Sequence, residues 1–407
     1  MRWVNVLSLR PSLEAAIAET ASQAQQTLGC DADLGIVFIA SAFASEYSRL
    51  LPLLREYLSV KHLIGCGGGG IVGTHPAQGL REVEQEPAFS LTLARLPGVK
   101  VQSFHLEPDE LPDLDSSPQA WVDCVGVNPQ EHPNFVLLAD PFSSRINDLL
   151  QGLDFAYAGC PKVGGLASGR SLRGGSGLFC NDRYYESGSV GIALSGAIQM
   201  KTIVAQGCRP IGPVFQVVEG EQNVLLQLMS TNGTQEETAL EALQNVVQSL
   251  DENDRQLAQH SLFVGLAHSE FQLELQAGDF LIRNLIGVDP RVGALAIGDR
   301  VRPGQRLQFH LRDAKASAED LRILLDRFCT TAQKAQSPAA LGALMFSCLG
   351  RGQGLYQQPD FDATLFQQYL GQIPLGGFFC NGEIGPIGGN TYLHGYTSAF
   401  GVFCPAA

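Results

Sequence analysis

The sequence predicts an α/β protein in which repeated strand–helix–strand units form mixed, partly antiparallel sheets flanked by helices. Apolar runs of strand length alternate with segments of helical spacing at three places in the chain, which is typical of parallel strand pairs. Successive strands predicted over residues 176–228 favour antiparallel pairing beside those units. The 407 residues are also many for one hydrophobic core, so two domains are expected.

The clearest unit lies near the end of the sequence. The runs GALMFSCLGR (342–351) and GFFCNGEIGPI (377–387) are apolar and then turn polar, as a buried strand does where it leaves a sheet. Residues 361–373 between them have helical spacing, and Asp362 suits the N-cap because a short side-chain oxygen can accept from free amide groups. In α/β proteins, ligands commonly bind to polar residues that lie just beyond the carboxyl ends of the strands.

The first half of the chain is predicted to hold two earlier copies of this unit. Pro52 is expected to kink the helix at residues 44–58, because proline lacks the amide hydrogen of a helix ladder. Alternation around Pro97-Gly98 predicts an antiparallel hairpin over residues 88–105, and the acidic segment 107–132 is expected at the surface. The expected strands are 3–9, 35–40, 61–65, 134–140 and 155–159, and the expected helices are 12–28, 44–58 and 143–153.

A domain boundary is expected between residues 225 and 232, where the turn-prone segment TNGT follows the strand block. The two domains are then residues 1–228 and 229–407. The second domain is expected to contain helices at 235–250 and 318–332, strands at 262–267, 280–286 and 306–311, the unit described above, and a final strand at 391–403.

Composition excludes several classes of function. With 27 basic and 41 acidic residues the net charge is −14, which opposes nucleic acid or an anionic membrane as the main partner. The N-terminus lacks the apolar core of a signal peptide, and no apolar run is long enough for a membrane span. The ten cysteines form no CxxC pair, so we expect buried free thiols and neither a metal site nor a cofactor.

Five motifs resemble those of the FIST sensory family, in which a FIST N domain precedes a FIST C domain. They are GCGGGG (65–70), GGLAS (164–168), FSCLGRG (346–352), GEIGP (382–386) and GYTS (395–398), and they occur in the family's order over nearly the whole chain. The resemblance implies a cytoplasmic signalling role and binding of a small ligand, such as an amino acid. Elsewhere in the family the domain pair is joined to output modules; here the two domains fill the length, so a separate output protein is expected.

Arg351 and Glu383 are the first candidates for ligand contact. They follow the two strands of one unit, and an α-amino acid needs both a cation for its carboxylate and an anion for its ammonium group. The alternative is structural: the two side chains pair with each other or cap backbone groups at a turn.

The glycines Gly67, Gly68 and Gly69 could turn amide N–H groups toward an anionic ligand. The run is neither a P-loop nor a dinucleotide fingerprint, because no Lys-Ser/Thr and no helix-opening GxGxxG accompany it. A chain reversal between two packed sheets explains the same glycines without a ligand.

Further candidates follow the same strands. Cys348, Cys380 and Asn381 stand at the strand ends, and Tyr396, Thr397 and Ser398 could line a pocket with hydroxyls or lie on an ordinary strand. A cysteine nucleophile with His394 as base and Glu383 as its orienting group is conceivable, but packed thiols are the favoured explanation of these cysteines.

Three functions therefore compete. The first is a stand-alone cytoplasmic sensor that binds a small metabolite and acts through a partner. The second is an adaptor that binds another protein without a ligand. The third is a cysteine-dependent enzyme, so the sequence leaves catalysis open.

Overall fold

The computed structural model describes residues 1–407 except 170–175, 232, 234, 270–274, 276 and 407. The chain forms two compact units, Met1–Val204 with Arg322–Ala407, and Ala205–Leu321. Both combine helices with mixed or antiparallel sheets, which confirms the predicted α/β class. The predicted domains, residues 1–228 and 229–407, stay a prediction. They are continuous sequence ranges, whereas the compact units are groups of residues that contact one another in space.

The described part of the first unit contains three copies of one arrangement. Copy 1 has β1 (Arg2–Ser8), α1 (Leu13–Leu28), β2 (Leu34–Ala40), α2 (Tyr47–Tyr57), β3 (His62–Gly68), β4 (Gly70–His75), β5 (Gly79–Glu84) and β6 (Phe89–Arg95). Copy 2 has β7 (Val99–Leu106), α3 (Pro118–Val125), β8 (Asn134–Ala139), α4 (Ile146–Ala156), β9 (Lys162–Leu166), β10 (Leu178–Cys180), β11 (Arg183–Tyr185) and β12 (Ser189–Gly196). Copy 3 has β13 (Ile198–Ala205), α7 (Ala314–Lys334), β21 (Gly342–Cys348), α8 (Gly352–Tyr356), α9 (Phe361–Leu370), β22 (Leu375–Cys380), β23 (Glu383–Ile387), β24 (Asn390–His394) and β25 (Ser398–Pro405).

The copies exchange hairpins in a cycle. The sheets run β1-β6-β2-β3-β10-β11, β7-β12-β8-β9-β23-β24 and β13-β25-β21-β22-β4-β5. In each sheet four strands come from one copy and the last two from another: copy 2 completes the first sheet, copy 3 the second and copy 1 the third. The triplicated pattern makes the first unit pseudo-threefold.

A glycine occupies the same register position in each parallel strand pair. Gly65 lies opposite Val37, Gly164 opposite Leu137, and Gly377 opposite Met345. A Cβ atom on these glycines would lie 2.2, 1.8 and 2.0 Å from the carbonyl oxygen of the opposite residue. Glycine is therefore required at all three positions, because no side chain fits so close to backbone.

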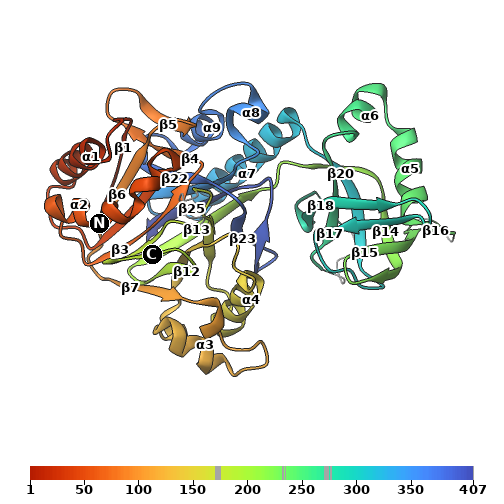
Figure 1. Cartoon of the computed structure of the whole chain (residues 1–407), viewed down its shortest axis with the longest axis horizontal. Helices are drawn as coiled ribbons and strands as arrows, with labels where there is room; N and C mark the ends of the chain where they lie inside the picture. Colours follow the sequence, from red (N-terminus) through yellow and green to blue (C-terminus); the bar gives the residue numbers. More distant parts are fainter. Residues whose placement is uncertain (170–175, 232, 234, 270–274, 276, 407) are drawn as a thin grey trace. The chain divides into compact units, whose positions relative to one another are not determined.

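Helices cover the outer faces of the sheets, and the inner faces share one core. Helices α1 and α2 pack on the first sheet and α3 and α4 on the second, on different sides of the unit (Figure 1). On the third, Phe366 of α9 stacks on Phe400 of β25 with ring centroids 5.0 Å apart. Apolar side chains from all three sheets, such as Ile64, Val163 and Phe378, meet in the common core. These strands are buried on both faces, so almost all of their residues are apolar and no alternation with polar residues is visible in the sequence.

Local signals fix the helix ends in several places. Ser12 caps α1, its Oγ accepting from the Ala15 amide at 3.2 Å, and Gly29 ends the helix with a positive φ of 69°. Asp362 is not the N-cap of α9 as predicted: Asp360 precedes the helix, and Asp362 lies inside its first turn. That carboxylate is instead used by Arg351, as described below.

The described part of the second unit is an antiparallel sheet with α5, α6 and the first residues of α7. It has β14 (Arg209–Glu221), β15 (Val224–Ser230), β16 (Glu236–Thr238), α5 (Ala239–Ser249), α6 (Glu252–Ala258), β17 (Leu262–Ala267), β18 (Phe280–Asp289), β19 (Ala294–Ile297) and β20 (Arg306–Leu311). The order is β14-β20-β17-β18-β19-β15-β16, and a further β14–β15 pairing closes the sheet into a barrel. The division between the compact units falls at the end of β13 and within α7.

Three sequence predictions about strands are wrong. The expected hairpin 88–105 forms two strands, but β6 pairs with β1 and β2 while β7 pairs with β12 in another sheet. The expected strand 155–159 is the end of α4 and a turn, and the true strand is β9, which contains the buried Lys162. The expected strand 391–403 is divided into β24 and β25. Alternation predicts that a segment is extended, but not which strand it pairs with.

Candidate functional site

The ends of β3, β9 and β22 meet at one place, and we call residues 67–69, 166–168 and 380–382 the strand-exit cluster. The amides of Ser168 and Gly169 donate to the Gly67 carbonyl oxygen at 3.1 and 3.0 Å. The Asn381 amide donates to Leu166 O at 3.1 Å, and the Leu166 amide donates to Gly382 O at 2.8 Å. Backbone hydrogen bonds thus join segments more than 200 residues apart.

Ser168 bridges all three strand ends. Its Oγ accepts from the Gly69 amide at 2.8 Å and donates to the carbonyl oxygen of Phe379. Gly69, Ser168 and Asn381 stand four residues after the close-approach glycines Gly65, Gly164 and Gly377, so they are equivalent positions of the three copies. Ser168 lies in the GGLAS motif but was not among the predicted site residues. Aligning the copies on those glycines would have found it.

The predicted site residues divide by exposure. Asn381 is exposed, and Gly69, Cys348 and Tyr396 are partly exposed. The other predicted residues are buried: Gly67, Gly68, Arg351, Cys380, Glu383, Thr397 and Ser398. A ligand arriving from solvent could therefore touch the first group directly, whereas the second group lies behind it.

The glycine run carries the chain from the first sheet to the third. Gly67 and Gly68 end β3, and Gly70 begins β4. A Cβ on Gly67 would lie 2.5 Å from Tyr47 Oη, and one on Gly68 would lie 2.9 Å from Phe378 Cβ. The Gly67 amide donates to Gly177 O at 2.8 Å, so it is already used within the chain. This geometry favours the chain-reversal interpretation of the run.

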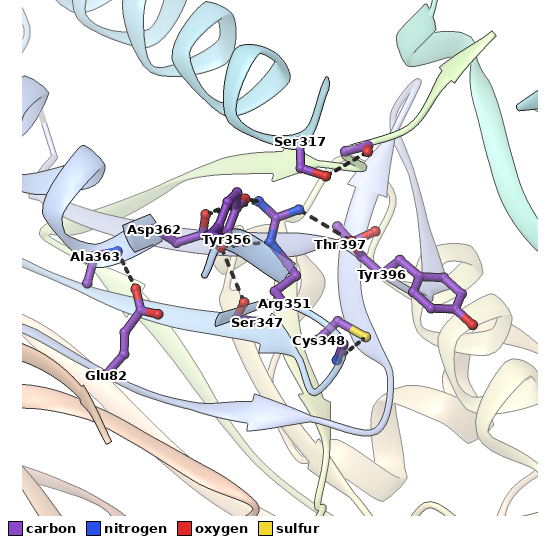
Figure 2. Close-up of polar contacts among 12 residues, drawn as sticks. Glu82, Ser317, Ser347, Cys348, Arg351, Tyr356, Asp362, Ala363, Tyr396 and Thr397 are labelled. Carbon is purple, nitrogen blue, oxygen red and sulfur yellow. Dashed lines mark hydrogen bonds and ion pairs between the residues drawn. The ribbon is translucent and has the colours of Figure 1, made fainter. Parts of the chain in front are cut away.

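Arg351 is completely buried and pairs with Asp362. Its Nε donates to Asp362 Oδ2 at 2.7 Å and its Nη2 to Asp362 Oδ1 at 3.0 Å, with both side chains 0% exposed. Nη2 also donates to the Tyr356 hydroxyl, and Nη1 to Tyr396 O at 3.4 Å (Figure 2). The planar guanidinium is therefore engaged along one edge by a carboxylate, which leaves that edge unable to bind the carboxylate of a ligand. Asp362 and Tyr356 were not among the predicted site residues.

Glu383 connects two strands of the third copy. Its Oε2 accepts from the Thr397 amide at 3.0 Å, which ties the start of β23 to the turn before β25. Ser398, the first residue of β25, is buried, and its Oγ has no hydrogen-bond partner among the described residues. The ring of Tyr396 points away from the Arg351 guanidinium (Figure 2).

The two candidate thiols differ in their surroundings. Burial raises the pKa of Cys380 well above its usual range, and the negative charge of Glu383 adds to the effect. Its Sγ donates to Phe378 O at 3.6 Å, while Nε2 of His394 donates to Gly385 O at 3.0 Å. No Cys380–His394 hydrogen bond is found in the described part of the chain, and a thiol held protonated is a poor nucleophile. Cys348 is partly exposed and accepts from the Gly350 amide at 3.5 Å.

Glu82 of β5 is a second buried carboxyl group close to Asp362. Its Oε1 accepts from the Ala363 amide at 2.6 Å, and its Oε2 has no hydrogen-bond partner among the described residues (Figure 2). Burial first, and the charge of Asp362 second, raise the pKa of this carboxyl well above its usual range. The folded protein therefore holds a proton on Glu82 at pH values where an unfolded chain would release it.

We expect Glu82 to make stability fall as pH rises. Its folded pKa lies above the unfolded one, so its stabilising contribution is complete below pH 4.5 and is lost as pH rises through the folded pKa. Glu82→Gln should therefore be more stable than wild type at neutral pH. The difference should grow by at most about 1.4 kcal/mol per pH unit.

The measurement is urea unfolding between pH 5 and 8. Glu86→Gln is the control, because Glu86 is exposed in the turn that follows β5. Parallel stability curves for wild type and Glu82→Gln would contradict the assigned proton.

Two general properties of the described residues bear on function. They contain no group of three or more His, Cys, Asp or Glu side chains arranged to hold a metal ion. Among the helices of the described chain, none combines the length and the apolar character that crossing a bilayer demands.

Known proteins similar to this chain place it in a family. An uncharacterized protein of Mycobacterium tuberculosis (strain ATCC 25618 / H37Rv) is 33% identical over 398 residues, covering 98% of each chain. An uncharacterized protein of Mycobacterium bovis is 32% identical over 395 residues, covering 97% of this chain and 96% of the relative. The crystal structure of cyanuric acid hydrolase from A. caulinodans covers 100% of this chain and 99% of its own at 9% identity, but its TM-score of 0.32 supports no conclusion.

The family models match in the order that the motifs predicted. The FIST N domain matches residues 33–230, and the FIST C domain matches residues 239–386. FIST domains are sensor domains of signal transduction. The chain therefore belongs to the FIST family.

Proposed function

We propose that this chain is a cytoplasmic sensor that binds a small metabolite, such as an amino acid, at the strand-exit cluster. The observation that carries the proposal is the convergence of three equivalent strand ends, Gly69, Ser168 and Asn381, at a place partly open to solvent. Ligands of α/β proteins bind beyond the carboxyl ends of parallel strands, and here three such ends share hydrogen bonds.

The proposed site has an accessible layer and a supporting layer. Asn381, Cys348 and Tyr396 would contact the ligand, together with Leu349, which is 43% exposed and covers Gly69. Arg351, Cys380, Glu383, Thr397 and Ser398 would hold the turns from behind, together with Gly67 and Gly68. Since Asp362 engages the guanidinium edge, a ligand's charged groups would be bound mainly by amides and hydroxyls of the accessible layer.

Signal output would pass through a separate protein. Both matched models are sensor domains, so the proposal requires a partner that recognises the ligand-bound form. Ligand binding can act on such a partner only if it favours one conformation of the sensor over another. The alternative function is an adaptor that binds its partner without a ligand. For an adaptor, no metabolite is expected to stabilise the folded protein.

The test is a thermal-shift screen of the full chain against amino acids and related metabolites. A ligand at 100 times its Kd should stabilise the folded state by about 2.7 kcal/mol and raise the melting temperature. Asn381→Ala should weaken binding by about two- to tenfold, the effect of losing one ordinary hydrogen bond. Asn147→Ala is the matched control, because Asn147 is an exposed amide on α4.

Two outcomes would overturn the proposal. If no metabolite raises the melting temperature, the sensor function fails and capture of a partner by the unliganded chain becomes the leading function. If a metabolite binds Asn381→Ala as tightly as wild type, and Cys348→Ala as well, the ligand site lies elsewhere.

A further inference from the structure

A separate pocket of about 250 Å³ lies beside the C-terminal end of α2 in the first unit. None of its lining residues belongs to the strand-exit cluster. They come from α2, from the segment that joins α2 to β3, from β3 itself, and from the turn between β10 and β11: Leu51, Leu54, Arg55, Leu58, Val60, Lys61, Leu63, Asn181 and Asp182.

Four leucines form the inner wall of the pocket, and each of their side chains is at most 6% exposed. Leu51, Leu54, Leu58 and Leu63 are buried side chains of the core beneath α2. The wall on the other side is held by Asn181, whose Oδ1 accepts from the Leu63 amide at 3.1 Å and whose own amide donates to Leu63 O at 2.7 Å. These hydrogen bonds hold the wall in place, which reduces the ordering cost of binding.

The rim of the pocket carries more positive than negative charge. Arg55 Nη2 lies 3.6 Å from Asp182 Oδ2, and the two side chains are 59% and 61% exposed. Lys61 adds a second cation, for which no ion pair is found among the described residues. The whole chain has a net charge of −14, whereas the mouth of this pocket has two cations and one carboxylate, so the local charge has the opposite sign.

We infer that this pocket binds a small monocarboxylic acid with an aliphatic or aromatic body. The body would lie on the leucines, and the carboxylate would lie between Arg55 and Lys61, where a guanidinium can bind it through two parallel hydrogen bonds. A volume of about 250 Å³ is below that of pockets for drug-sized ligands, so the acid is small. Asp182 competes with the ligand for Arg55 and opposes binding.

The experiment is a ligand-observed NMR titration of the full chain with 3-phenylpropionate, and with 3-phenylpropanol as its uncharged match. Arg55→Gln and Lys61→Gln should each weaken binding of the acid by about two- to fivefold, the effect of a partly exposed ion pair. Asp182→Asn should strengthen it by about the same factor, because it frees Arg55. Lys334→Gln is the control, since Lys334 is an exposed cation at the end of α7.

The outcomes separate this site from the proposed sensor site. Saturable binding that weakens in both cation variants, strengthens in Asp182→Asn and is unchanged in Asn381→Ala supports the inference. No saturable binding, equal binding of the alcohol, or equal affinity in wild type and both cation variants would overturn it. Weaker binding by Asp182→Asn would also overturn it, because a zwitterion such as phenylalanine would then be the favoured class.

Discussion

Arg351→Met is expected to lower the free energy of unfolding by about 3–5 kcal/mol, because it leaves the Asp362 carboxylate buried without its cation. Both side chains are 0% exposed, and two parallel hydrogen bonds join them. The loss should appear as a lower urea midpoint with an unchanged slope.

Two further variants test the cause of that loss. Arg351→Met combined with Asp362→Leu should recover most of the stability, since a buried ion pair can be replaced by apolar residues of similar volume. Arg49→Met should change little, because Arg49 pairs with Glu14 and Glu46 at the surface. A single Arg351→Met variant as stable as wild type would show that the pair contributes no more than a surface salt bridge.

Gly164→Ala is expected to destabilise the protein by more than about 4 kcal/mol, or to prevent folding, since steric overlap with backbone is among the most damaging of substitutions. Its Cβ would lie 1.8 Å from the Leu137 carbonyl oxygen, and neither strand of the parallel pair can move without disturbing its sheet. Gly65→Ala and Gly377→Ala should behave alike, because the Cβ of each meets the opposite carbonyl oxygen in the same way.

The matched control is Gly354→Ala in α8. No heavy atom lies within 4 Å of a Cβ at Gly354, and its φ is not positive, so alanine should be neutral or slightly stabilising. Circular dichroism and urea unfolding of the four variants provide the comparison. If Gly164→Ala, Gly65→Ala and Gly377→Ala unfold like Gly354→Ala, the shared close approach of the strands is not required.

Much of the secondary structure could be predicted from the sequence. The strands at 262–267 and 306–311 have the predicted bounds, and the helix at residues 12–28 begins one residue later than expected. These segments are long or strongly periodic, so local pattern is enough. The strand expected at 155–159 missed β9, whose first residue, Lys162, is of a type that is rarely buried. Its Nζ lies 2.8 Å from Oδ1 of Asp154 in α4.

The site was predicted less completely than the fold. Cys348 and Cys380 were placed at neighbouring strand ends, and they are indeed register partners in β21 and β22. The partner of Arg351 was missed because Asp362 has the features of a helix cap, and sequence alone cannot distinguish a carboxylate that caps from one that turns inward. Glu82 was missed because it comes from copy 1, far from copy 3 in sequence.

The sequence by itself determined the α/β class, the family, and the strand–helix–strand unit in copies 1 and 3, because periodicity, glycine punctuation and motif order are local properties. Only the tertiary structure decided the cyclic exchange of hairpins, the meeting of Gly69, Ser168 and Asn381, and the pairing of Arg351 with Asp362. Each of these depends on which strand lies beside which, and a strand's pattern of apolar residues does not name its neighbour.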